Sequence, residues 1–165
     1  MDETLMALRQ AEYVHVVLNH LPIIGLLAGL MVLVIAIFQK SRATAIAAYS
    51  VIFVMSLSVF PVTEFGEKAE DQVESLLDKT GRHWLEEHSA RADRAGWIYY
   101  VAAGFALGGL IAPRFLPKSA PFFLWATLLI GIAALTAGLW IASAGGKIMH
   151  REFRYSIAPD GGSAN

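Results

Sequence analysis

Long uninterrupted apolar stretches alternate with short polar segments along this chain. Four stretches contain no charged residue, and they cover residues 13–38, 43–62, 95–112 and 119–144. A helix that crosses the hydrocarbon core of a bilayer needs about 20 mostly apolar residues. A helix on the surface of a soluble protein would instead show a polar stripe every three or four residues. The pattern therefore predicts an all-α protein, a four-helix transmembrane bundle.

The connection between the second and third stretches, residues 63–94, is long and charged. Its first half places Ala69, Val73 and Leu76 at helical spacing among acidic residues. This spacing predicts an extra amphipathic surface helix between spans 2 and 3, which lies on the membrane or caps the bundle.

The second half of this connection is expected to be a helix that runs unbroken into the third span. It starts near Arg82, contains no proline, and has its first glycine at Gly96. On such a helix His88 shares a face with the apolar residues, whereas His83 lies on the charged face. We therefore expect His88 to point inward and His83 outward.

Composition supports the membrane interpretation. The 165 residues are 56% hydrophobic and 16% charged, and their mean hydropathy is +0.51, which is too apolar for an ordinary soluble domain. We divide the chain into an N-terminal tail (residues 1–12), a four-span membrane domain (13–155) and a flexible tail (156–165). The chain has no cysteine, so an iron–sulfur cluster held by thiolates is excluded.

The two short turns between spans are basic, with Lys40 and Arg42 in one and Arg114 and Lys118 in the other. Positive charge close to span ends favours the cytoplasmic side. The opposite face, which receives both termini and the long connection, is then expected to be periplasmic.

All five histidines lie at the span ends opposite the basic turns: His15, His20, His83, His88 and His150. Helical bundles build cofactor and metal sites from side chains on facing helices, and neutral imidazole ligates haem iron, copper and zinc. The pattern predicts a cofactor site of His20, His88 and His150, or a metal site of the same three with Glu67.

The role of His15 stays open in this interpretation. His15 and His20 are five positions apart, a rotation of about 140° on a regular helix, so both cannot face one centre. Pro22 belongs in the first turn of a helix, which predicts that the regular span begins near Leu21 and that His20 is the deeper of the two.

Four segments of the chain carry a resemblance to a known family: "HVVLNHLPI" from His15, "TEFGEKAEDQVE" from Thr63, "EEHSARADRA" from Glu86 and, at Gly145, "GGKIMH". In this order they resemble the bacterial membrane-protein family catalogued as domain of unknown function 2231. The family's commoner first motif has proline where Val16 stands here. The resemblance implies a multi-pass protein of the bacterial inner membrane and nominates His20, Glu67, His88 and His150, but it names no reaction.

Three functions remain as hypotheses. The first is a b-type haem, or a metal held by histidine and carboxylate, that serves electron transfer in a bioenergetic complex. The second is a non-catalytic accessory subunit of a larger membrane complex, with no cofactor. The third is a small transporter, for which the spans offer only neutral polar residues.

The expected partners are the lipid bilayer and other membrane subunits or an electron-transfer protein. The sequence has no phosphate-binding glycine loop, no Ser–His–Asp arrangement and no broad basic surface. We therefore expect no nucleotide cofactor, no nucleic acid partner and no catalytic activity of the chain's own.

Overall fold

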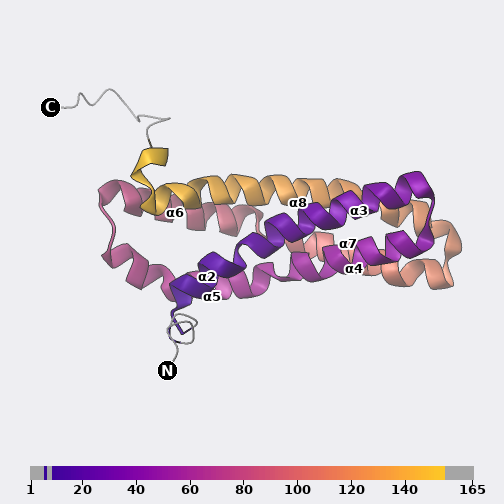
Figure 1. Ribbon diagram of the computed structural model, residues 1–165, viewed down its shortest axis with the longest axis horizontal. Coiled ribbons are helices and arrows are strands. Elements are labelled where there is room, and N and C mark those ends of the chain that lie inside the picture. The colour runs from indigo at the N-terminus through magenta and orange to yellow at the C-terminus, as the bar shows by residue number, and fades with distance from the viewer. Residues whose placement is uncertain (1–5, 7–8, 155–165) are drawn as a thin grey trace.

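The computed structural model describes residues 6 and 9–154, and it folds residues 11–149 into four long helical segments that lie side by side (Figure 1). Each segment is long and apolar enough to cross a membrane. This confirms the all-α four-helix bundle and a multi-pass membrane protein. The helices in chain order are α2 (Ala11–Leu18), the π-helical turn η1 (Leu21–Gly25), α3 (Leu26–Gln39), α4 (Arg42–Leu57), α5 (Val59–Ser75), α6 (Lys79–Ala95), α7 (Trp97–Phe115), the 3-10 turn η2 (Pro117–Ser119), α8 (Ala120–Met149) and the 3-10 turn η3 (Arg151–Phe153).

The expected amphipathic helix is present as α5, but it is not a separate element on the membrane surface. It continues α4 across Ser58 and packs along α2. The short break has a local cause, because Pro61 has no N–H to donate to the carbonyl of Leu57, one turn earlier. The helix of the second span therefore continues beyond its apolar residues into the charged segment, as far as Ser75.

The third segment agrees with the sequence, because α6 and α7 form one continuous helical run through Gly96. The N–H of Gly96 still donates to the carbonyl of Ala92 at 2.7 Å. The helix begins at Lys79 rather than near Arg82.

The first segment differs from the expectation that the regular span begins near Leu21. Helix α2 already starts at Ala11, and Pro22 is accommodated inside the π-helical turn that joins α2 to α3. The wider turn lets the helix pass a residue that cannot donate a hydrogen bond. Ala11 and Glu12, placed in the N-terminal tail by the sequence, are thus helical. Residues 1–5 and 7–8 and the flexible tail of 156–165 lie outside the described residues.

The core of the bundle combines large side chains from α3 and α4 with small ones from α7 and α8. Leu26, Leu33 and Ile52 are fully buried, as are Ala106 and Ala134. Many large apolar side chains point outward instead, such as Phe38 with 82% of its surface exposed and Leu129 with 65%. Such a surface would be unfavourable in water and is expected for helices that face lipid.

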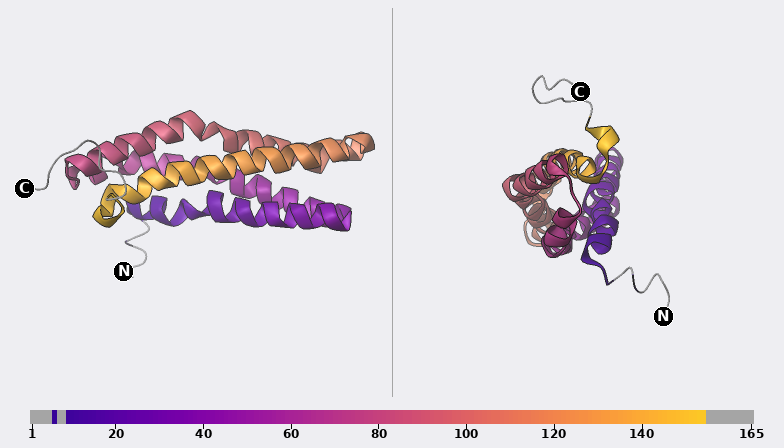
Figure 2. Two further views of the ribbon diagram at one scale, coloured as in Figure 1. Left: turned by 90° about the horizontal axis from the view of Figure 1, so that it is seen from above. Right: turned by 90° about the vertical axis from the view of Figure 1, so that its left-hand side faces the viewer.

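The two short turns lie at one end of the bundle, and the connection between α5 and α6 lies at the other (Figure 1). Near this second end α2 packs along α5, and α6 packs along α8. Figure 2, right, looks along the bundle from this end and shows the helical segments around a common axis. The chain is thus two helical hairpins, α2–α5 and α6–α8, placed side by side.

Close packing between the hairpins depends on Gly109 of α7. A Cβ atom at this position would lie 2.5 Å from the ring of Tyr49, which is buried. At Gly104 of the same helix, no atom lies within 4 Å of the corresponding position. We expect Gly109→Ala to lower the free energy of unfolding by about 1–3 kcal/mol, the usual cost of overpacking.

Denaturant titration of the purified protein in detergent, followed by circular dichroism, measures this change. Gly104→Ala is the control and should leave stability unchanged or slightly higher, since alanine favours a helix over glycine. Equal stability of the two variants would contradict the packing role of Gly109.

Candidate functional site

Two of the five histidines face each other across the two hairpins. The rings of His15 on α2 and His88 on α6 lie 6.3 Å apart between centroids, and their planes are at 88°. The other three do not join them: His20, His83 and His150 are exposed. The candidate site is therefore the pair of His15 and His88, which we call the histidine pair.

His15 is fixed by the second helix of its own hairpin. Its Nδ1 lies 2.8 Å from the carbonyl oxygen of Val62 on α5. One turn further along α5, Gly66 leaves room for the ring, because a Cβ there would lie 2.9 Å from Nδ1. The absence of a side chain at Gly66 is what allows the half-buried imidazole to reach the backbone.

His88 is held in the same way by the second hairpin. Its Nδ1 lies 3.0 Å from the carbonyl oxygen of Ile141 on α8. One turn further, a Cβ at Gly145 would lie 3.1 Å from Nδ1. In each hairpin, then, a histidine of the first helix meets a carbonyl and, four residues later, a glycine of the second.

These contacts fix which ring nitrogen carries a proton in the neutral form of each histidine. A carbonyl oxygen can only accept a hydrogen bond, so Nδ1 must carry the proton and donate it. The neutral ring then has an unprotonated Nε2 with a free lone pair, which is the form that ligates metals. Within residues 9–154, neither Nε2 has a hydrogen-bond partner. The histidine pair therefore offers two oriented nitrogen ligands.

The histidine pair lies at the polar edge of the apolar bundle. About 24 residues separate His15 from Gln39 at the end of α3, which is roughly 36 Å of helix at 1.5 Å per residue. The hydrocarbon core of a bilayer is about 30 Å thick. With the short turns at one membrane surface, the length of the helices puts the pair close to the other surface.

The ligands predicted from sequence do not come together as one set. His20 turns away from His15, and its Nδ1 contacts the carbonyl of Val16 in its own helix at 3.0 Å. Nδ1 of His150 is 2.9 Å from Oε1 of Glu152, and Glu67 is exposed. Among the described residues, no group of three or more His, Asp or Glu side chains could hold a metal ion.

The sequence pattern nominates His88 and leaves the role of His15 open, and His15 is the residue that faces His88. A signal was available in the chain. The rotation of about 140° means that only one of His15 and His20 can face inward, and Gly66 in the "TEFGEK" segment marks space for a ring on the neighbouring helix. His83 is outward, as expected, and His88 is inward.

Arg91 strengthens the contact between α6 and α8 next to His88. Its guanidinium donates to the carbonyl of Trp140 at 2.9 Å and to Oγ of Ser143 at 3.0 Å, and it pairs with Glu87 at 2.8 Å. It also lies 4.7 Å from the Trp140 ring centroid, within the range of a cation–π contact. His88 is thus anchored on a helix that is locked to its neighbour.

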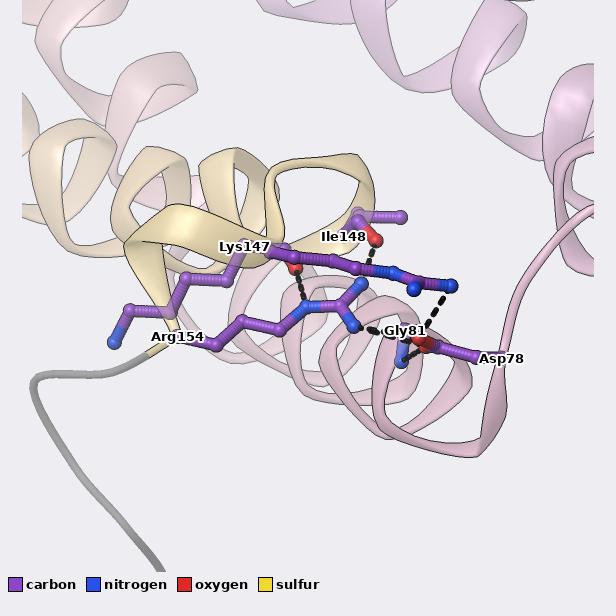
Figure 3. Close-up of polar contacts among 6 residues, drawn as sticks. Asp78, Gly81, Lys147, Ile148 and Arg154 are labelled. Atoms are coloured by element: carbon purple, nitrogen blue, oxygen red, sulfur yellow. Dashed lines mark hydrogen bonds and ion pairs between the residues drawn. The ribbon is translucent and has the colours of Figure 1, made fainter.

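A second polar cluster fastens the far ends of the same two helices (Figure 3). Arg154 donates to the carbonyls of Lys147 and Ile148, the last turn of α8, and its Nη1 contacts both carboxylate oxygens of Asp78 at 2.9 and 3.0 Å. Asp78 in turn caps α6, since its Oδ1 accepts from the N–H of Gly81 at 2.6 Å. The negative charge of Asp78 at the start of α6 and the positive charge of Arg154 at the end of α8 each complement the helix dipole.

A scan of protein-family models, a comparison with curated proteins and a comparison with solved structures each find no match for this chain. The resemblance drawn from the four sequence motifs therefore stays an expectation.

The cap at Asp78 leads to a prediction about pH. The backbone N–H of Gly81, followed by the Arg154 guanidinium, holds the pKa of the Asp78 carboxyl below its ordinary value of 3.8. A group whose pKa is lowered on folding stabilises the fold above its unfolded pKa, and this stabilisation is lost as the pH falls through the folded pKa. We expect Asp78→Asn to be less stable than the parent chain at neutral pH.

The stability difference between Asp78→Asn and the parent chain should shrink as the pH falls below about 4. The parent carboxyl then becomes protonated and uncharged, like the asparagine amide. Thermal unfolding in detergent between about pH 7 and pH 3 measures it. The matched control is Asp71→Asn, at an exposed position on α5, which should follow the parent chain throughout. A constant difference for Asp78→Asn at every pH would argue against a carboxylate cap.

Proposed function

We propose that this chain is a b-type haem protein of the membrane, in which His15 and His88 would hold the iron, and that it serves electron transfer. The observation that carries the proposal is the shared hydrogen bonding of the two rings. Each donates Nδ1–H to a backbone carbonyl of a neighbouring helix, which leaves both Nε2 atoms free for iron.

The spacing of the rings fits one metal centre between them. Two imidazoles bound on opposite sides of one iron have ring centres about 6 Å apart, given roughly 2 Å for each metal–nitrogen bond and about 1 Å within each ring. The measured separation is 6.3 Å. The angle of 88° between the two ring planes is compatible with one metal centre. The angle of each ring about its own metal–nitrogen bond is independent of the other ring's angle.

The number of ligands favours haem over a metal ion held by protein groups alone. Structural zinc takes four protein ligands and catalytic zinc three, whereas haem iron needs only one or two axial ligands. The histidine pair supplies two, and the chain has no cysteine for covalent attachment of the macrocycle. A non-covalent, b-type haem is therefore the better fit.

The chain's own residues have clear tasks in this proposal. The carbonyls of Val62 and Ile141 orient the rings and make Nε2 a stronger donor to metal. The haem would supply a one-electron couple. A site at the polar edge would let a partner protein approach the macrocycle, and the basic turns opposite favour a periplasmic location of this edge in a bacterial inner membrane.

Absorption spectroscopy of the purified protein, reconstituted with haem, tests the assignment residue by residue. We expect a Soret band and a low-spin spectrum in the parent chain, and loss of the low-spin form in His15→Ala and His88→Ala, because each removes one axial nitrogen. His20→Ala and His150→Ala are the matched controls and should retain the parent spectrum, since both side chains lie outside the pair.

Two other outcomes would redirect the proposal. Loss of the spectrum in His20→Ala, with retention in His15→Ala, would transfer the ligand role to the residue favoured by the sequence. A colourless protein that takes up no haem and copurifies with other membrane subunits would favour a non-catalytic accessory role.

The two glycines of α8 provide a second test with an internal control. Gly145→Ala places a methyl group 3.1 Å from Nδ1 of His88, whereas a Cβ at Gly146 has only one ordinary contact, 3.8 Å from Phe153. We expect Gly145→Ala to weaken haem retention by about tenfold, the order found when the partner of a metal ligand is disturbed. Gly146→Ala should bind like the parent chain. Titration with haem, followed at the Soret band, measures both affinities.

A further inference from the structure

The turn end of the bundle contains a cavity that the histidine pair does not involve. Its volume is about 620 Å³, and it is lined by both hairpins, from α3 and α4 on one side and from α7, η2 and α8 on the other. This volume is within the usual range for sites that bind small molecules. Residues of both short turns line the cavity. Because these turns lie at the ends of the spans, the cavity is near one membrane surface.

The lining of the cavity is amphipathic. Most of the wall is aliphatic, aromatic or proline, including Ile37, Leu110 and Trp125, whereas Lys40 and Arg42 of the first turn also line it. Such a cavity suits a molecule with an apolar body and a negatively charged head.

Within residues 9–154, the positive charge of Lys40 and Arg42 has no acidic partner. The sequence contains no acidic residue in 13–63 or in 94–151, and none of the ion pairs found among the described residues involves Lys40 or Arg42. At the other end several cations, Arg91 and Arg154 among them, are paired with carboxylates. A ligand with an acidic head would supply the missing counter-charge.

Lys40 also has a backbone conformation that glycine or asparagine adopts more easily than lysine does. It ends α3 with φ at 51°, in the left-handed region where glycine or asparagine is usual at a helix end. A lysine at this position keeps a positive charge at the cavity despite the backbone strain.

We propose that this cavity binds an anionic phospholipid, with the phosphate at Lys40 and Arg42 and an acyl chain along the apolar wall. Basic pockets between transmembrane helices recognise acidic lipid headgroups by the same chemistry. The site is separate from the histidine pair and does not depend on the presence of haem.

Native mass spectrometry of the detergent-solubilised chain tests the proposal with two added lipids of equal acyl chains, phosphatidylglycerol and phosphatidylcholine. We expect the parent chain to retain phosphatidylglycerol in preference. The double variant Lys40→Asn with Arg42→Gln should lose this preference by roughly 30-fold, from about 1 kcal/mol per basic side chain near an anionic headgroup and about 1.4 kcal/mol per tenfold change.

Three controls make the result specific. Arg114→Gln with Lys118→Gln removes the same charge from the other turn, whose basic residues do not line the cavity, and should keep the preference. Ala45→Leu enlarges an apolar wall residue without a change of charge and should reduce retention of both lipids. Lys40→Asn relieves the left-handed strain, so unchanged or higher thermal stability would show that lost binding is not lost folding.

Two results would overturn the proposal. Equal loss in both charge variants would indicate diffuse surface attraction rather than a site. Displacement of phosphatidylglycerol by inorganic phosphate alone, with no effect of Ala45→Leu, would indicate an anion site that makes no use of an acyl chain.

Discussion

The absence of water from the bilayer interior is the constraint on which the rest of this structure depends. Each backbone N–H and C=O in the hydrocarbon region must find its partner within the protein, and a continuous helix is the simplest way to do so. The chain accordingly forms four helical segments. Two of its departures from regular helix occur where proline removes a donor, at the π-helical turn containing Pro22 and at the break before Pro61. Both lie toward the end of the bundle that carries the histidine pair.

The same arrangement explains how two histidines from distant parts of the sequence reach one place. Each first helix of a hairpin packs along the second helix, so an imidazole can reach a carbonyl only where the facing residue has no side chain. Gly66 and Gly145 provide that space, each four residues after the carbonyl that is used. Because the hairpins lie side by side, their two anchored rings meet across the boundary between them.

Much of this fold could be predicted from sequence, because apolar length and helical spacing are local signals. The four spans, the helical character of the 63–94 connection and the inward face of His88 all follow from them. The identity of the residue that faces His88 does not follow from these local signals. Periodicity gives the angle between His15 and His20 but not which of them faces the bundle, and that choice depends on α5 extending beside α2 and on the space at Gly66. Glu67, by contrast, lies off the apolar stripe of Ala69 and Val73 and is exposed on α5, as the spacing along this one helix already indicates.

The distribution of charge assigns different roles to the two ends of the bundle. At the histidine end two arginines bind other parts of the protein: Arg91 is bound to Glu87 and Trp140, and Arg154 joins the ends of α6 and α8 through Asp78. Charge there is used to hold helices in register, which a pair of oriented ligands requires. At the turn end, none of the ion pairs among the described residues involves Lys40 or Arg42. The charges of Lys40 and Arg42 therefore remain available beside the apolar cavity, whereas the groups left free at the histidine end are the two Nε2 atoms of the histidine pair.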